Sequence, residues 1–116
     1  MKRSEEAVAA VQRALLTSMG PEAAEQLALA QLRVAWDEVV AAAGLARGGM
    51  ASRLARYANG TAQIQASEPI LAQELTLRAD SLVRAVNERL RGRPGATMEL
   101  RRLAISVHRW RGSPSL

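Results

Sequence analysis

Apolar side chains recur every three or four residues near the start of this chain, the spacing of one helix face. In residues 4–18 this stripe comprises Val8, Val11 and Leu15. Ser4, followed by two glutamates, suits an N-cap and an acidic first turn. The pattern predicts a first helix over this segment, whose apolar side either closes the core or docks on a partner.

A second helical stripe follows the Gly20-Pro21 pair, which interrupts the first helix. It comprises Leu29, Leu32, Trp36, Val39, Val40 and Ala43. Pro21 fits the first turn of a helix, and Gly44 is a typical C-cap. We therefore expect a second helix from Pro21 to a cap at Gly44, with Trp36 in the core.

The period then changes to the two-residue alternation of β-strands. A glycine-rich loop over residues 44–49 leads into a first strand from Met50 to Tyr57. Asn59-Gly60 is the pair that a type I′ hairpin turn prefers. Residues 61–66 alternate apolar and polar side chains and give the clearest strand signal, so a β-hairpin is expected here.

A third, longer stripe begins after Ser67-Glu68-Pro69, which suits a capped helix start. It comprises Leu71, Leu75, Ala79, Leu82, Val86 and Leu90. Glycine and proline in residues 92–95 end this third helix. A final strand is predicted from Leu100, Leu103, Ile105 and Val107, and the change of parity near Arg101-Arg102 indicates a bulge.

The resulting order is α-α-β-β-α-β, an α+β fold. The hairpin and the last strand form a three-stranded sheet that helices cover on one face. A chain of 116 residues has material for one core. We expect a single domain over residues 1–111 and a flexible tail over residues 112–116.

Composition argues against catalysis and metal binding. The chain has no cysteine, and His108, its one histidine, has the position of an end-of-strand surface residue. No serine has a partner that would activate it, and no phosphate-binding P-loop is present. The chain is therefore predicted not to be an enzyme, and to bind neither a cofactor nor a small-molecule substrate.

No signal peptide or long apolar run is present, so the protein is expected to be soluble, cytoplasmic and without a membrane partner.

The positive charge is concentrated in the second part of the chain. Residues 1–46 carry four basic and six acidic side chains, net −2, whereas the remainder carries twelve and five, net +7. Fifteen of the sixteen cations are arginines, whose planar fork pairs with phosphate. The bias fits an anionic partner such as nucleic acid, and it fits equally a GC-rich genome.

Candidate nucleic-acid contacts come from the strand region and its flanking loops, where pairing in one sheet would bring the charges together. They are Arg47, Arg53, Arg56, Arg91, Arg93, Arg101, Arg102, Arg109, Trp110 and Arg111. Trp110 has two interpretations, stacking on a base or capping the sheet. Gly92-Arg93-Pro94-Gly95 matches the G-x-x-G loop of KH domains, but that loop joins two helices and this one joins a helix to a strand.

Several short motifs occur in the order found in the DciA family, bacterial proteins associated with loading the replicative DNA helicase. Trp36-Asp37-Glu38-Val39-Val40 resembles the family's W-x-x-V-V opening, and Asn59-Gly60 with the following strand resembles its turn and strand. Ala72-Gln73-Glu74-Leu75 is similar to its A-x-E-L helix opening, and residues 82–90, containing Asn87, resemble its L-x-x-x-L-N helix end. With the closing strand at Leu103, Ile105 and Val107, the resemblance spans about residues 27–108. It departs from the family pattern at Ala41, at residues 47–50 and at Leu71.

The resemblance implies a KH-like domain that binds DNA, especially single-stranded or forked, and a DnaB-type replicative helicase whose loading it promotes. It also implies a nucleoid-associated location within the cytoplasm. Two alternatives remain open at this point. One is an RNA-binding KH-like module, and the other is a protein-protein adaptor whose arginines meet acidic surfaces.

Overall fold

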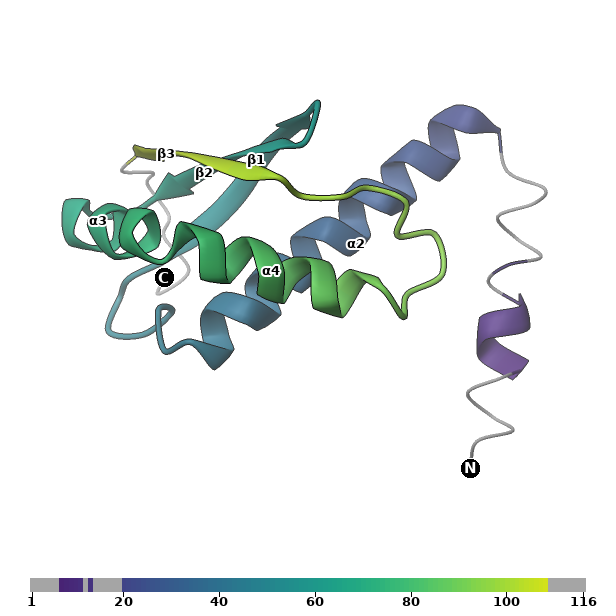
Figure 1. The fold of residues 1–116 in the computed structure, drawn as a ribbon, viewed down its shortest axis with the longest axis horizontal. Helices are drawn as coiled ribbons and strands as arrows, with labels where there is room; N and C mark the ends of the chain where they lie inside the picture. The colour runs from purple at the N-terminus through teal and green to yellow at the C-terminus, as the bar shows by residue number, and fades with distance from the viewer. Residues whose placement is uncertain (1–6, 12, 14–19, 109–116) are drawn as a thin grey trace.

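The computed structural model describes residues 7–11, 13 and 20–108 of the chain. Residues 7–11 are helical, as expected for the first helix. The predicted C-terminal tail, residues 112–116, lies outside the described residues. The elements follow one another as α2 (Pro21–Ala42), β1 (Ser52–Ala58), β2 (Thr61–Ala66), α3 (Pro69–Leu77), α4 (Ala79–Leu90) and β3 (Arg102–Val107) (Figure 1). The predicted α+β class is confirmed.

The three strands form one sheet in the order β1-β2-β3. β1 and β2 are antiparallel across the Asn59-Gly60 turn, where φ is 50° and 83°; these positive values confirm the predicted turn. β3 runs parallel to β2. The two helices between these strands form the crossover that returns the chain to the end of the sheet where β2 begins. β2 is therefore the central strand.

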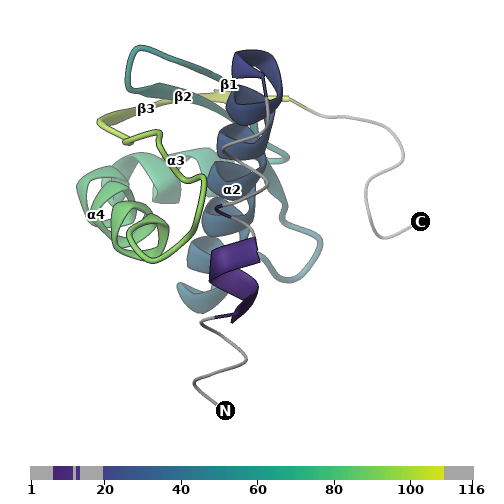
Figure 2. The same ribbon diagram turned by 90° about the vertical axis from the view of Figure 1, so that its right-hand side faces the viewer.

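The helices α2, α3 and α4 lie on one side of this sheet, and no described helix covers the other side (Figures 1 and 2). The core fills the space between the sheet and the helices. Its largest fully buried side chains are Trp36, Leu32, Ile64, Leu71, Leu75, Leu100 and Val86. Trp36 was predicted to be buried, and its indole Nε1 donates a hydrogen bond to Ser52 Oγ at 3.0 Å.

The end of α2 confirms the predicted glycine cap. Gly44 has φ +74°, which only glycine adopts at little cost. The Leu45 N–H donates to Val40 O at 2.9 Å and the Gly44 N–H donates to Ala41 O at 3.1 Å, which together make a Schellman motif. Leu45 is buried beneath this turn, so the motif also directs the chain back to the core.

The predicted third helix is wrong in one respect, because it is divided at Arg78 into α3 and α4. Arg78 has φ −104° and ψ 11°, outside the helical range. α3 packs on β2 and β3, whereas α4 packs mainly on α2. A single straight helix would not serve both surfaces, so the break follows from tertiary packing.

The bulge was also predicted in the wrong strand. The pairing of β1 with β2 shifts between Leu54 and Arg56, whereas β3 pairs regularly with β2 throughout. Leu100 is buried but precedes β3, which begins at Arg102. The change of parity near Arg101 is therefore the boundary between loop and strand.

None of the helices in the described part of the chain combines the length and the apolar character needed to cross a membrane.

Candidate nucleic-acid interface

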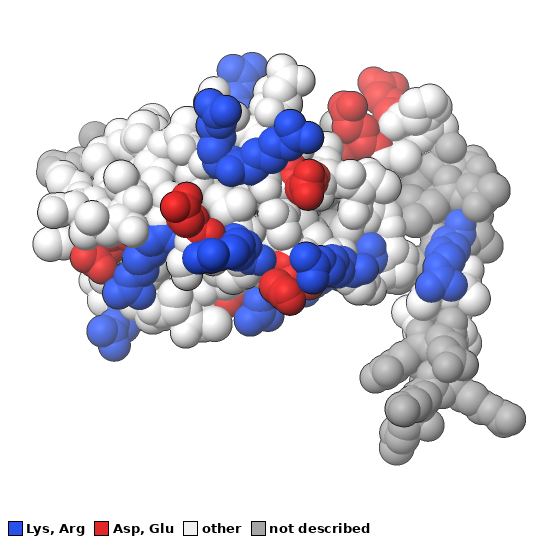
Figure 3. Space-filling view, in the orientation of Figure 1, with Lys and Arg blue, Asp and Glu red and all other residues white. Residues whose placement is uncertain are grey.

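The open face of the sheet carries arginines at both edges and polar side chains along its centre. β1 contributes Arg53 and Arg56, which pair in register with Gln65 and Gln63 of β2. On the other side, Arg102 of β3 pairs in register with Thr61. All three arginines are exposed, and Figure 3 shows basic side chains gathered over the strands. We call Arg53, Arg56 and Arg102, with Thr61, Gln63 and Gln65, the open face.

The bulge in β1 explains why two of these arginines share a face. Residues three apart in a regular strand point to opposite sides. Ala55 is the extra residue, so Arg56 returns to the side of Arg53 while Leu54 is buried and Tyr57 is half-buried. A β-bulge often re-aims a side chain in this way.

The three arginines differ in their contacts. Arg53 Nε donates to Gln65 Oε1 at 2.7 Å across the two strands. In the described residues, no carboxylate lies within ion-pair distance of Arg56 or Arg102. Two cationic groups are therefore available to an anion in the solvent.

Arg33 was not among the predicted residues, but it lies beside this face. Its guanidinium donates to Leu54 O at 3.1 Å and to Ala55 O at 3.3 Å, at the bulge. It lines a surface groove together with Arg53 and Asp37. Partial burial raises the pKa of the Asp37 carboxyl. Arg33 flanks the apolar stripe of its helix, and that position alone does not reveal a strand contact.

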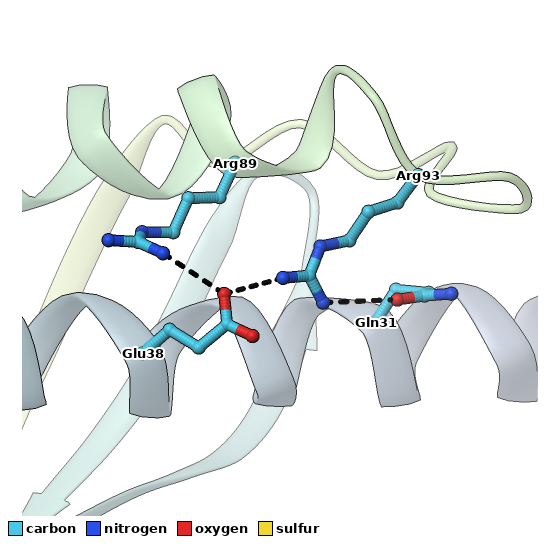
Figure 4. A network of polar contacts seen from close by, with 4 residues as sticks. All are labelled: Gln31, Glu38, Arg89 and Arg93. Carbon is cyan, nitrogen blue, oxygen red and sulfur yellow. Dashed lines mark hydrogen bonds and ion pairs between the residues drawn. The ribbon is translucent and has the colours of Figure 1, made fainter. Parts of the chain in front are cut away.

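Arg93 is instead engaged inside the protein (Figure 4). Its guanidinium forms an ion pair with Glu38 of α2 and a 3.5 Å hydrogen bond to Gln31 Oε1. Arg89 donates to the same Glu38 oxygen at 3.2 Å. The hydrogen bond from Arg93, followed by the Arg93 charge and the contact with Arg89, holds the pKa of Glu38 below its ordinary value, although desolvation opposes this shift. This network fastens the end of α4 to α2.

The G-x-x-G sequence lies between α4 and β3, as predicted, and not between two helices. Gln31 Nε2 donates to Pro94 O at 3.3 Å, so α2 holds this loop as well. The two helices that do adjoin each other, α3 and α4, meet at Arg78 with no glycine nearby. A KH-type backbone clamp is therefore not built at either place.

The remaining predicted residues are dispersed. Arg47 is exposed in the loop between α2 and β1, and Arg91 pairs with Glu88 at 3.5 Å beyond α4. Arg101 lies immediately before β3, beside the hairpin turn. Arg109, Trp110 and Arg111 lie outside the described residues. The structure thus places Arg53, Arg56 and Arg102 on one face of the sheet, and Arg101 next to Arg102 beside the hairpin turn.

No group of three or more histidine, cysteine or acidic side chains that could hold a metal ion occurs among the described residues. His108 is exposed at the end of β3, as predicted.

These features define a small α+β protein with a three-stranded sheet whose open face carries arginines. A family model described as "Dna[CI] antecedent, DciA" matches residues 2–98, so the chain belongs to the DciA family. The match starts well before the expected residue 27 and ends before β3, so it includes the first helix and omits the closing strand. No curated protein and no solved structure matches the chain.

Membership implies a role of the replicative helicase loader type, in DNA replication and helicase loading. The family is not a known enzyme family.

Proposed function

We propose that this protein is a cytoplasmic, nucleoid-associated accessory factor without catalytic activity, which binds single-stranded or forked DNA and a DnaB-type replicative helicase and promotes loading of that helicase. The observation that carries the DNA-binding part is the open face, with arginines at both edges of a sheet face that no helix of the described residues covers. The helicase-loading part is supported by membership of the DciA family. A single domain over residues 1–111 carries both activities.

The side chains of the open face favour contacts with the DNA backbone. Arginine, glutamine and threonine all donate hydrogen bonds to phosphate oxygens. Among the described residues, the two large aromatic side chains in and beside the sheet, Trp36 and Tyr57, are engaged within the fold. Binding should therefore be salt-dependent and tolerant of base sequence. Stacking by Trp110 stays a prediction.

The helicase requires a second surface, and exposed apolar side chains on α3 provide one. Ile70 is 63% and Leu77 is 72% exposed, and their spacing of seven residues places both on one side of the helix. Exposed apolar patches mark protein–protein interaction sites. We assign the helicase contact to this side of α3.

The direct test is fluorescence anisotropy of labelled single-stranded DNA, forked DNA and RNA of equal sequence, titrated at low and high salt. Salt-weakened DNA binding, together with capture of purified DnaB-type helicase, supports the proposal. A clear preference for RNA would indicate an RNA-binding module instead. Helicase capture without affinity for either nucleic acid would leave the protein as an adaptor.

A further inference from the structure

The segment Glu99–Arg102 joins the α4–β3 loop to β3, and Asn87 of α4 holds it by both groups of one side-chain amide. Asn87 Nδ2 donates to Leu100 O at 2.8 Å, and its Oδ1 accepts from the Leu100 N–H at 2.9 Å. The Leu100 side chain is meanwhile fully buried in the core. Leu100 is therefore fixed by its backbone and by its side chain.

Two further residues hold the flanking positions of the same segment. The Tyr57 hydroxyl donates to Glu99 O at 2.6 Å. The Gly60 carbonyl accepts from the Arg101 N–H at 2.8 Å and from the Arg102 N–H at 3.1 Å. We call Tyr57, Gly60 and Asn87, which come from a strand, a turn and a helix, the clamp.

The clamp also shapes the surroundings of the Arg101 side chain. A Cβ on Gly60 would lie 2.8 Å from Arg101 Cδ, so the absence of a side chain at Gly60 gives the arginine stem its place. A surface hollow of about 450 Å³ opens there, with Asn59 and Arg101 in its lining. The Arg101 side chain is 74% exposed, and its Nε lies 3.8 Å from Glu99 Oε1. An exposed pair of this kind contributes little, so the guanidinium can turn to a stronger anion.

We propose that the clamp residues are positioning residues for nucleic acid, which hold Arg101 and Arg102 side by side at the edge of the open face so that both engage the phosphate backbone. This inference rests on the proposed function. Its physical basis is preorganisation, because a segment already ordered in the unbound protein loses less conformational entropy on binding. Asn87 and Gly60 lie in motifs that resemble those of the DciA family, and the motifs alone do not reveal this role.

A double-mutant cycle on DNA affinity tests this role. Asn87→Ala should weaken binding of labelled single-stranded DNA by about threefold or more in the wild-type background. In the Arg101→Ala/Arg102→Ala background the same change should have no further effect, because the residues it positions are gone. Tyr57→Phe removes only one hydrogen bond and should show the same pattern more weakly, which keeps the test valid where Asn87→Ala fails to fold.

Val39→Ala, a change of a buried α2 residue that takes no part in the hydrogen bonds of the clamp, is the control for lost stability and should leave DNA affinity unchanged. Equal effects of Asn87→Ala in both backgrounds, or no effect of either clamp variant on affinity, would overturn the inference while the proposed function stands. A wild-type protein without DNA affinity would overturn both.

Discussion

The Glu38 carboxylate of α2 forms an ion pair with the Arg93 guanidinium beyond the end of α4, and the pair fastens the α4–β3 loop to α2. Arg89 donates to the same carboxylate oxygen. Because these contacts favour the ionised form, they hold the pKa of Glu38 below its ordinary value of 4.5. The neighbouring Asp37 has the opposite shift, since burial raises its pKa.

This contrast predicts opposite effects of two isosteric substitutions. The Glu38 carboxylate stabilises the fold fully above pH 4.5, and that contribution is lost as pH falls through its lowered folded-state pKa. Glu38→Gln should therefore lower the free energy of unfolding at pH 7. Asp37→Asn should raise it slightly, because partial desolvation of the Asp37 charge disfavours the folded state above the raised pKa. Urea unfolding at a series of pH values measures both, and the differences from wild type should shrink in acid.

Two leucines of α3 should differ sharply in their contribution to stability. Leu75 is 0% exposed and Leu77 is 72% exposed. Leu75→Ala should cost about 2–5 kcal/mol of unfolding free energy, whereas Leu77→Ala should change it by less than about 0.5 kcal/mol. Urea denaturation of the two variants makes the comparison. A large cost for Leu77→Ala would show that α3 packs differently.

Gly60→Ala should destabilise the protein by about 1 kcal/mol or more. The position has φ +83°, and an added Cβ would displace the Arg101 stem. Asn59→Gly, at the adjacent turn position with φ 50°, is the matched control and should be nearly neutral. Thermal unfolding of both variants decides the point. Equal stability of Gly60→Ala and wild type would mean that the turn relaxes freely.

The two proposed surfaces should be separable by substitution. Ile70→Asp/Leu77→Asp places charges on the exposed side of α3 and should abolish capture of the purified helicase. Because this side of α3 is distinct from the open face, DNA affinity should fall less than twofold. Parallel anisotropy and pull-down assays provide the readout. Retained helicase capture would refute the assignment of this surface.

The helical stripes and the hairpin could be predicted from the sequence because they depend on local periodicity and turn chemistry. The division at Arg78 could not, since apolar positions continue from Leu75 through Ala79 to Leu82 without glycine or proline. The break arises because α3 and α4 pack on different partners. The sequence did hold a signal for the β1 bulge, because Leu54 and Tyr57 are three residues apart. In a regular strand they would point to opposite faces, yet Leu54 is buried and Tyr57 is half-buried.

The candidate site was predictable in part. Alternation indicated that strand arginines would gather on one sheet, and Arg53, Arg56 and Arg102 do so. The engagement of Arg93 could not be foreseen, because its partner Glu38 is 55 residues away. Sequence distance likewise concealed the contact of Asn87 with Leu100, which depends on where the chain returns after α4.

The central claim, that the open face binds DNA, is tested most directly by the salt dependence of the DNA dissociation constant. Arg53→Ala/Arg56→Ala/Arg102→Ala should reduce the slope of log affinity against log salt concentration by about 2, because three phosphate contacts are lost. Arg78→Ala/Arg84→Ala/Arg91→Ala removes the same charge from the helical side and should retain nearly the wild-type slope. Equal slopes for the two variants would show that net charge, and not the open face, determines binding.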